Sequence, residues 1–356
     1  MISDLRLQQF RSYQDASFEF SQGVNIIVGP NGSGKTNLLE ALLVLAVGRS
    51  YRVGDAELLS FGAEWCRLDA DIHGSNATRT VKIKTIPKQS KTYDINGKQY
   101  FRLTQPHLLP VVLFEPNHLQ LLHGAPELRR NYLDDLLELT MPGFISFRKN
   151  YRRLLSQRNA LLKRPRLPST QELFPWNLRL SELGATIARA RAELISQLAE
   201  SLPALYKDLS QTETALSIEY HPKFPIESYE SHMLAKLESH VVEDAQRGFT
   251  AYGPHREDFM VYFANNPAAE TASRGETRTA LLALKILELQ QLEQVRGQTP
   301  LLLLDDVFSE LDGARRQALT TYVQRYQTFI TTTDADLVIQ HFTEAANIIP
   351  IQKAIT

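Results

Sequence analysis

The sequence predicts an α/β fold in which one domain is made from both ends of the chain, with a mainly helical domain inserted between them. Three observations lead to this prediction. Residues 24–47 have the pattern of a buried strand, a glycine-rich turn and a helix. Residues 299–333 have a strand, a polar helix and a second strand. Between these two regions, residues 127–200 are rich in arginine and have the texture of helices.

The N-terminal hundred residues are expected to combine antiparallel ribbons with one strand–loop–helix unit. Residues 2–10 and 17–20 look like half-buried strands, and 24–28 (VNIIV) like a fully buried one followed by a helix at 37–47. The Asn96-Gly97 pair within 91–103 predicts a β-hairpin, because this dipeptide suits a two-residue turn. Residues 108–114 predict another buried strand.

In the rest of the chain, prolines within 163–176 are expected to break the helical runs, and 221–225 (HPKFP) marks a second irregular segment. Strand texture returns at 258–264. A helix at 279–295, a strand at 299–307, a polar helix at 313–326 and a strand at 328–333 follow. We therefore expect one domain over 1–115 and 248–356, and a mainly helical arm over 116–247.

The composition favours no unusual class of protein. The chain has 356 residues, 43% of them hydrophobic, and a net charge of -1, which points to no particular partner. One cysteine, Cys66, excludes an intramolecular disulfide and favours a reducing compartment, and we expect it to be buried. No signal peptide is visible, and the most apolar stretch, 38–48, is too short to cross a bilayer. We expect a cytoplasmic protein without a membrane partner.

Residues 29–36 (GPNGSGKT) match the phosphate-binding pattern G-x-x-x-x-G-K-S/T between a buried strand and a helix. Glycines let the backbone wrap around phosphates, and the start of a helix favours an anion. We expect Lys35 to reach the β- and γ-phosphates of ATP, and the Thr36 hydroxyl to bind Mg²⁺. The predicted nucleotide-binding residues of this loop are Gly29, Pro30, Asn31, Gly32, Ser33, Gly34, Lys35, Thr36 and Asn37.

Two aspartates follow the four leucines of 301–304. A phosphate-binding loop needs a second carboxylate for Mg²⁺ at the end of a neighbouring strand, and Asp305 is the first polar residue after the run. Asp306 is then placed to act with Lys35 in catalysis, as a general base toward the attacking water. The alternative is that the two aspartates cap the next helix.

A second anion-facing helix start occurs far along the chain, at Ser273, Arg274, Gly275 and Glu276. By itself this segment is equally an ordinary helix N-cap. In a protein with a phosphate-binding loop it resembles the signature segment of ABC-type ATPases. In that class two heads sandwich two nucleotides, and the signature of one head caps the γ-phosphate held by the other. The resemblance implies that these four residues act in trans.

Further segments narrow the resemblance. SELD (309–312) is similar to the D-loop of ABC heads, which implies that Asp312 lies at a dimer seam. FRSY (10–13) resembles the opening of SMC-like heads, which implies that Arg11 and Ser12 approach the nucleotide. Together with the segments above, GRSYR, GAPELRRNYLD, GPHRED and TTTD follow the order of the RecF family from residue 10 to 334.

The resemblance to the RecF family implies an ABC-type P-loop ATPase head built from both ends of the chain, with the inserted arm. It also implies ATP and Mg²⁺ as cofactors, and a homodimer that forms on ATP binding. Such a dimer would bind single- and double-stranded DNA at gaps and help RecR, possibly with RecO, to load recombinase onto single-stranded DNA. Its expected role is in DNA replication, recombinational repair and the SOS response.

Three positions depart from the related patterns. Asp306 stands where many ABC heads carry glutamate, and Glu276 where the RecF pattern usually carries glutamine. The switch histidine of ABC heads is replaced by TTTD (331–334), in which Thr333 is the candidate. We therefore expect a weak, DNA-stimulated ATPase whose slow hydrolysis serves as a timer for release.

Between residues 129 and 166 the chain has ten Lys or Arg and three acids, a local net charge of +7 (10 − 3). Such a cluster is typical of a phosphate-binding face without sequence readout, although a solvated helical face is the alternative. Core packing is expected for Tyr132 and Tyr151, and a structural role for His255, Arg256 and Asp258. The predicted DNA-binding residues are Arg129, Arg130, Arg148, Lys149, Arg152, Arg153 and Arg158.

Two rival functions are less consistent with the sequence. A transporter ATPase subunit would carry a shorter insertion between Thr36 and Ser273 and a visible switch histidine. An SMC-type tether would need long heptad repeats on both sides of the insertion, which helices broken by proline do not sustain.

Overall fold

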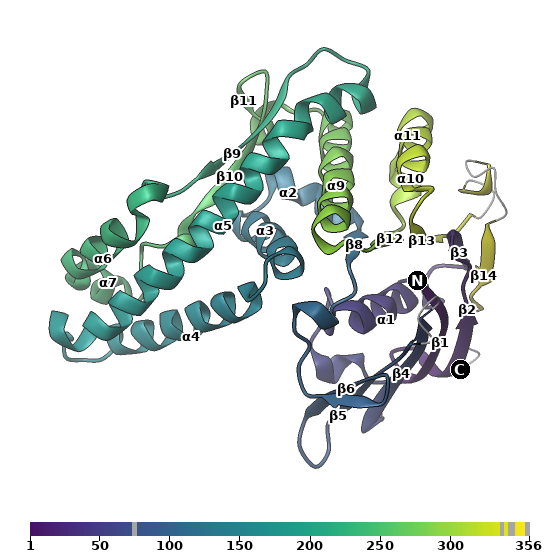
Figure 1. The fold of residues 1–356 in the computed structure, drawn as a ribbon, viewed down its shortest axis with the longest axis horizontal. Coiled ribbons are helices and arrows are strands. Elements are labelled where there is room, and N and C mark those ends of the chain that lie inside the picture. Colours follow the sequence, from purple (N-terminus) through teal and green to yellow (C-terminus); the bar gives the residue numbers. More distant parts are fainter. Residues whose placement is uncertain (73–76, 335–337, 341–345, 353–356) are drawn as a thin grey trace. The chain divides into compact units, whose positions relative to one another are not determined.

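The computed structural model describes residues 1–72, 77–334, 338–340 and 346–352 (Figure 1). The chain divides into two compact units, one formed by Met1–His118 with Glu288–Thr356 and the other by Leu119–Leu287. The first boundary lies close to the expected one. The second falls about 40 residues later than expected, because β10 (Asp258–Phe263) pairs with β9 (Leu216–His221) and so joins residues 258–263 to the inserted unit.

The first unit contains two sheets. The larger is antiparallel, with strand order β2-β1-β4-β5-β6-β7, and includes the predicted hairpin, whose Asn96 and Gly97 both have positive φ. Along β4 and β5, buried side chains alternate with more exposed ones, so one face of these strands is apolar. The strands are β1 (Ile2–Phe10), β2 (Tyr13–Glu19), β4 (Trp65–Ile72), β5 (Ala77–Lys84), β6 (Ser90–Ile95) and β7 (Lys98–Tyr100).

The second sheet is parallel, with strand order β14-β3-β13-β12-β8. Residues 301–304 of β12 and all residues of β13 are buried, which explains their near-continuous apolar and threonine sequences. Because the strands are parallel, their carboxyl ends lie at one edge, where ligands of open α/β sheets bind. The strands are β3 (Val24–Val28), β8 (Val111–Phe114), β12 (Leu301–Asp305), β13 (Gln327–Thr332) and β14 (Asn347–Pro350).

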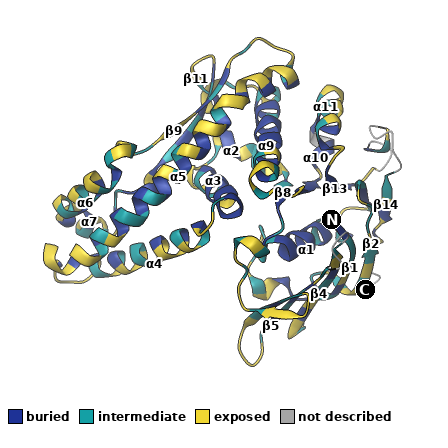
Figure 2. Ribbon diagram, viewed as in Figure 1, coloured by how far each residue is buried: buried dark blue, intermediate teal, exposed yellow. Residues whose placement is uncertain are grey.

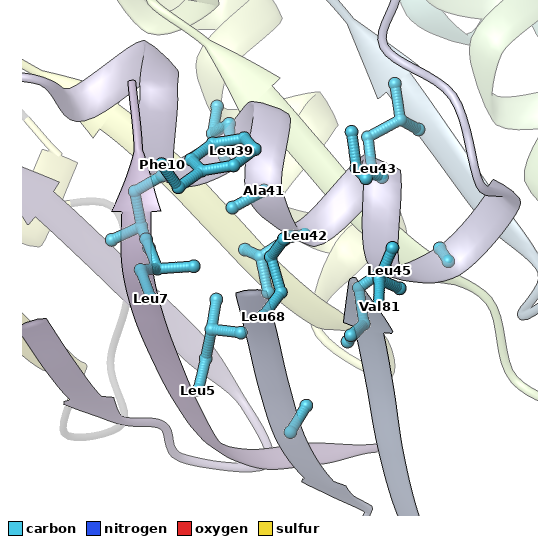
Figure 3. Packing of buried hydrophobic residues seen from close by; sticks show 14 of the residues in the cluster. Leu5, Leu7, Phe10, Leu39, Ala41, Leu42, Leu43, Leu45, Leu68 and Val81 are labelled. Carbon is cyan, nitrogen blue, oxygen red and sulfur yellow. The ribbon is translucent and has the colours of Figure 1, made fainter. Parts of the chain in front are cut away.

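Helix α1 (Lys35–Val47) contacts strands of both sheets, which explains why almost every residue along it is buried. Leu5, Leu7 and Leu68 of the antiparallel sheet point toward Leu39, Ala41 and Leu42 of the helix (Figure 3). Cys66 belongs to the same core, as expected, and burial raises the pKa of its thiol to about 12. Helix α1 is thus held by contacts with both sheets.

The remaining elements of the first unit are helices and short 3-10 turns. Helices α10 (Val307–Glu310) and α11 (Gly313–Val323) follow β12, and the last part of α9 (Arg274–Arg296) continues into this unit. Short 3-10 turns occur at η1 (Asp55–Leu58) and η2 (Gln105–His107), and η3 (Pro116–Leu119) follows β8.

The second unit is mainly helical, as expected, with a three-stranded sheet of order β11-β10-β9. Helix α5 contacts α4, α6 and β9, so its apolar stripe is covered within the unit. The elements are α2 (Gln120–His123), α3 (Pro126–Thr140), α4 (Phe144–Leu162), α5 (Thr170–Ser210), η4 (Ile226–Ser228), α6 (Tyr229–Ser239), α7 (Val241–Arg247), η5 (Pro254–Arg256), β11 (Asn266–Pro267) and α8 (Ala268–Thr271).

The expected effect of the prolines is only partly right. Helix α4 ends at Leu162, and residues 163–169 are irregular, but α5 then runs for 41 residues through Pro175 and Pro203. Ser169 and Glu172 form a capping box at its start, where the Ser169 hydroxyl accepts a hydrogen bond from the Glu172 N–H. Pro175 lies in the second turn, close to the end where prolines are best tolerated. Tertiary packing therefore overrides the local helix-breaking signal.

Among the described residues, none of the helices combines the length and the apolar character that a membrane span requires.

Candidate nucleotide-binding site

The predicted phosphate-binding loop connects the carboxyl end of β3 to the start of α1. Gly34 has a φ of 108°, and a Cβ at this position would lie 2.8 Å from Oγ of Ser12 and 3.0 Å from Oη of Tyr13. Gly32 also has a positive φ, of 77°. The left-handed backbone favours glycine at both positions, and at Gly34 the close approach of Ser12 and Tyr13 excludes a side chain as well. Asn31 and Gly32 are exposed at its tip.

Two side chains of the loop are directed into it. Lys35 Nζ donates hydrogen bonds to the carbonyl oxygens of Gly29 (2.7 Å) and Pro30 (3.0 Å). Burial lowers the pKa of Lys35, while the carboxylates of Asp306 and Asp305 raise it. The Ser33 hydroxyl is buried without a hydrogen-bond partner among the described residues. A buried hydroxyl of this kind is suited to a ligand oxygen.

At the edge of the parallel sheet, the carboxylate of Asp305 accepts hydrogen bonds from several hydroxyl groups. Its Oδ1 accepts hydrogen bonds from Thr36 Oγ1 (3.0 Å) and Thr331 Oγ1 (2.8 Å). Its Oδ2 accepts one from Tyr51 Oη (3.0 Å). Burial, followed by the Asp305 charge, raises the pKa of Tyr51 well above its usual range, so the phenol keeps its proton and donates. The structure thus brings Thr36 and Asp305 together, as the sequence predicts.

Asp306 adopts a left-handed conformation, with a φ of 54°. Its N–H donates to Thr331 Oγ1 at 2.9 Å, and its side chain makes no capping hydrogen bond to α10. Asp306 therefore occupies the N-cap position of α10 but does not cap the helix through its side chain. Left-handed backbone at a residue other than glycine is uncommon and concentrates at functional sites. The general-base role of Asp306 stays a prediction.

The FRSY turn braces the loop and α1. Tyr13 Oη donates to the Gly34 carbonyl at 3.0 Å, and Asn37 Nδ2 donates to Ser12 Oγ at 3.0 Å. Arg11 Nε and Nη2 bind both carboxylate oxygens of Glu40, at 2.7 and 3.0 Å, and Nη1 donates to the Glu57 carbonyl. Glu40 is fully buried in α1. The Arg11 contacts that we observe are therefore structural, and a direct contact with nucleotide stays a prediction.

These residues fit ATP with Mg²⁺. Mg²⁺ prefers hard oxygen ligands and is usually held by one or two side chains together with substrate phosphates. The paired oxygens of Thr36 and Asp305 supply this donor set, and the unsatisfied Ser33 hydroxyl and Lys35 lie on the adjacent loop.

The residues predicted for the dimer seam and the switch lie in the same unit. Asp312 is the N-cap of α11, where its carboxylate accepts from the Arg315 N–H at 3.0 Å and pairs with the Arg315 guanidinium. Thr333 is exposed directly after β13. Both side chains are exposed on the first unit. The roles of Asp312 at a dimer seam and of Thr333 as a switch stay predictions.

In the second unit, the predicted signature segment forms a capping box at the start of α9. The Ser273 hydroxyl accepts from the Glu276 N–H at 3.2 Å, and the Glu276 carboxylate accepts from the Ser273 N–H at 2.8 Å. Ser273 and Arg274 are exposed, and Gly275 is half-buried. Ser273 is therefore a helix N-cap, and its hydroxyl keeps a proton to donate. A further role in trans stays a prediction.

The predicted DNA-binding set requires a correction, because three of its members are buried in ion pairs. Arg129 binds Asp258 through two hydrogen bonds of 2.8 and 2.7 Å. Arg148 pairs with Asp134, Asp135 and Glu138. Arg158 is inaccessible and binds Asp244, Asn177 and Thr250. Arg129, Arg148 and Arg158 hold the helices of the second unit together and cannot reach DNA in this fold.

Three other members of the predicted set, Lys149, Arg152 and Arg153, are exposed on α4. Arg130 is half-buried and donates to the Glu257 carbonyl at 2.8 Å. Lys163, Arg164 and Arg166 are exposed in the segment after α4. A basic surface therefore exists on and after α4, although it is smaller than the sequence count suggests.

Tyr132 and Tyr151 are buried, as expected for core residues. His255 lies between Tyr151, whose Oη is 2.7 Å from its Nδ1, and the Thr250 carbonyl, 3.0 Å from its Nε2. Burial lowers the pKa of His255 to about 4. Asp258 is the ion-pair partner of Arg129, and Arg256 stacks on the ring of Phe249. These contacts fit the structural role that the sequence analysis expected for His255, Arg256 and Asp258.

The fold and this site define an ABC-type P-loop ATPase head of the class that includes SMC proteins. A family model described as the RecF/RecN/SMC N terminal domain matches residues 1–356. A solved structure of an Smc head bound to the C-winged helix domain of ScpA shares the fold, with a TM-score of 0.57, 16% identity and coverage of 98% of this chain and 93% of that chain.

More similar proteins narrow the class. The DNA replication and repair protein RecF of Synechococcus sp. (strain JA-3-3Ab) is 35% identical over 343 residues, which cover 92% of this chain and 90% of that protein. RecF of Nostoc punctiforme is 36% identical over 345 residues, with coverage of 93% and 92%. A solved structure described as the recombination mediator protein RecF-ATPrS in the RecFOR pathway has a TM-score of 0.89 and 29% identity, covering 99% and 96%. The chain belongs to the RecF family.

Sequence reasoning did not assign Glu40, Tyr51 or Thr331 to the site. A glutamate within an apolar helix, at position 40, was a signal for a buried ion pair. Tyr51 lies in GRSYR, a segment used for the resemblance without a physical role. Thr331 lies at the end of β13, between the two strands that carry the loop and Asp305.

Proposed function

We propose that this protein is an ATP-dependent DNA-binding protein of replication and recombinational repair, which acts in the cytoplasm. ATP binding joins two copies on single- or double-stranded DNA at gaps. The dimer helps RecR and RecO to load recombinase onto single-stranded DNA. Slow hydrolysis, stimulated by DNA, releases the dimer.

The observation that carries this proposal is the hydrogen bond between Thr36 Oγ1 and Asp305 Oδ1, at the carboxyl edge of the parallel sheet and beside the phosphate-binding loop. This pairing is the arrangement that a nucleotide-bound Mg²⁺ requires. The existence of related structures described as RecF-ATPrS and RecF-ATP supports ATP as the ligand.

The chemistry assigns distinct roles to the residues of the site. The backbone N–H groups of the loop and the ammonium of Lys35 hold the β- and γ-phosphates in position. Thr36 and Asp305 would hold Mg²⁺, which when bound neutralises charge on the phosphates. Asp306 accepts a proton from the attacking water. Its side chain is one methylene shorter than the glutamate of many ABC heads, which is consistent with a slow reaction.

The second copy completes the site. Ser273 and the N-terminus of α9 present a hydroxyl and free N–H groups to the γ-phosphate held by the partner copy. The exposure of Ser273 and Arg274 supports this role. Asp312 and Thr333 lie at the seam and respond to the state of the nucleotide. ATP binding and dimerisation are thereby linked, because each site needs residues from both copies.

DNA is held through its phosphates by the exposed basic surface formed by Lys149, Arg152 and Arg153 on α4, with Lys163 and Arg164 beyond it. Such a surface recognises charge and shape, with no base-specific readout. The outcome is a dimer that can bind gapped DNA of any sequence.

The molecular mass of the protein in solution tests this function, measured without nucleotide, with ATP, and with ATP and gapped DNA. We expect a monomer, an ATP-dependent dimer, and a dimer on DNA. Lys35→Met is the control: losing the charge on the phosphates should abolish the ATP-dependent dimer. A wild-type protein whose mass and DNA binding ignore ATP would contradict the proposal.

A further inference from the structure

We propose that Tyr51 is a positioning residue for the metal carboxylate: it holds Oδ2 of Asp305, so that Oδ1 faces Thr36 and the bound Mg²⁺. The inference rests on the proposed function and adds to it a residue outside the phosphate-binding loop and the aspartate pair.

The two oxygens of Asp305 have different partners. Oδ1 lies 3.0 Å from Thr36 Oγ1, the other metal candidate. Oδ2 lies 3.0 Å from Tyr51 Oη, which makes no hydrogen bond to the phosphate-binding loop among the described residues. With Oδ2 held, rotation of the carboxylate about its Cβ–Cγ bond would break the phenol hydrogen bond. Thr331, which donates to Oδ1, and Tyr51 therefore fix the plane of the carboxylate together, and Tyr51 supplies the hydrogen bond to the oxygen that Thr36 does not contact.

The position of Tyr51 is fixed by a buried ion pair. Residues 48–53 leave the C-terminus of α1 through Gly48, whose φ is 74°. Ser50 Oγ donates to a carboxylate oxygen of Glu40 and accepts from the N–H groups of Arg52 (2.9 Å) and Val53 (3.2 Å). The same carboxylate binds Arg11. The fully buried Glu40 thus ties this segment to α1.

Through this arrangement, the Arg11–Glu40 ion pair helps to position residues of the nucleotide-binding site. Glu40 lies on the same helix as Thr36, and through Ser50 it fixes the turn that carries Tyr51. The Thr36 hydroxyl, which would bind Mg²⁺, and the Tyr51 phenol, which orients Asp305, are therefore both anchored to α1. Partners that orient metal ligands in this way commonly change metal affinity by about 10–100-fold when they are removed.

Tyr51→Phe is the variant that tests the proposal, because it keeps the ring packed in the core and removes only the hydroxyl. We expect about tenfold weaker binding of Mn²⁺, used as the probe, in the presence of saturating ATP. Bound Mn²⁺ is measured by electron paramagnetic resonance. ATP binding without metal, measured by calorimetry, should be unchanged. Tyr326→Phe is the matched control, since Tyr326 Oη also donates to a carboxylate, that of Glu293 (3.0 Å), but lies before the amino end of β13, while the site is at the carboxyl end.

A double-variant cycle with Asp305→Asn separates positioning from a general structural effect. If Tyr51 acts through Asp305, Tyr51→Phe should add no further loss of Mn²⁺ affinity in the Asp305→Asn background. Wild-type Mn²⁺ affinity in Tyr51→Phe would overturn the proposal, and so would an additive loss. Weaker ATP binding in the absence of metal would instead make Tyr51 a nucleotide contact. Failure of the wild-type protein to bind Mn²⁺ with ATP would contradict the proposed function itself.

Discussion

Nη1 of Arg158 lies 2.7 Å from Oδ2 of Asp244, and neither side chain is accessible to solvent. The buried residues of α4 explain why this arginine is in the core. Arg148, Tyr151, Arg158 and Leu162 are spaced three, seven and four residues apart, so they lie along one face of the helix. Lys149, Arg152 and Arg153 are exposed. Figure 2 shows both buried and exposed colours along α4. The positive charge of this helix is therefore divided between a structural stripe and a surface.

Arg158→Met should destabilise the second unit without acting on DNA directly. It leaves the Asp244 carboxylate buried and unpaired, which we expect to cost about 3–5 kcal/mol of unfolding free energy. Urea unfolding measures this loss. If the variant is as stable as wild type, the buried pair contributes nothing. If it remains folded and loses DNA affinity, Arg158 contacts DNA after all.

Reversing the exposed charges, in the double variant Arg152→Glu and Arg153→Glu, should weaken DNA binding and flatten its salt dependence. Each lost phosphate contact lowers the slope of log K against log salt by about 0.9. Binding is measured by fluorescence anisotropy over a range of salt concentrations. The control reverses Arg189 and Lys207, which are exposed on α5. An unchanged slope in the first variant would exclude this surface of α4 as the DNA-binding site.

His255 makes the stability of the fold depend on pH. Its pKa is lowered to about 4 in the folded state by burial, so it is neutral where an unfolded histidine, with a pKa near 6.5, already takes up a proton. Stability should therefore be full above pH 6.5 and fall as the pH decreases toward 4. We expect a loss of about 2 kcal/mol between pH 7 and pH 5, measured by urea unfolding.

The control for this prediction is His255→Gln, which cannot titrate. Its unfolding free energy should change less over the same pH interval, although its value at pH 7 is lower because the contact with Tyr151 is altered. Equal pH dependence in the two proteins would assign the effect to other groups.

The sequence predicts best what a local pattern determines. The phosphate-binding loop and the strand before Asp305 follow from glycine spacing and four leucines, because both are local in the chain. The Thr36–Asp305 contact spans 269 residues and followed only from the general requirements of a phosphate-binding loop. The role of Tyr51 depends on a turn held by Glu40, and the helix through Pro175 depends on packing. No pattern of neighbouring residues contains that information.

Asp306→Asn should keep nucleotide binding and slow hydrolysis, because an amide cannot accept a proton from water. General-base catalysis contributes about 10²–10⁴-fold, so we expect at least a hundredfold decrease in the single-turnover rate. The dimer should persist longer on DNA. The side chain makes no capping hydrogen bond to α10, so the substitution should not remove a helix cap. An unchanged rate would remove Asp306 from catalysis.

Ser273→Arg tests whether the start of α9 acts across the dimer. Each copy should still bind ATP through its own loop, because Lys35 and Thr36 are intact. Dimerisation should fail, since the large side chain fills the space meant for the γ-phosphate of the partner copy and the hydroxyl is lost. Arginine could attract the phosphate by its charge, so the expected loss rests on size and on the missing donor.

The capping box complicates this test, because Ser273 also stabilises α9 through Glu276. Ser273→Ala is the control: it removes the same cap at a cost of about 1 kcal/mol but adds no bulk. Thermal unfolding of both variants then separates the effect of the cap from the effect on the dimer. If Ser273→Arg is folded and dimerises with ATP as wild type does, Ser273 is only a helix cap.

Mixing Ser273→Arg with Lys35→Met distinguishes a site in trans from one in cis. In a mixed dimer, one site combines the intact Lys35 of the first variant with the intact Ser273 of the second, while the other site carries both changes. A site in trans therefore predicts partial recovery of ATPase activity on mixing, up to about half of the wild-type value per dimer if the two sites act independently. A site in cis predicts none, because every site then contains one change. The measurement is ATPase activity across a series of mixing ratios, with the dimer fraction determined by mass in the same samples, so that activity is compared per dimer formed. Recovery that rises and falls with the fraction of mixed dimer would establish that Ser273 serves the nucleotide of the other copy.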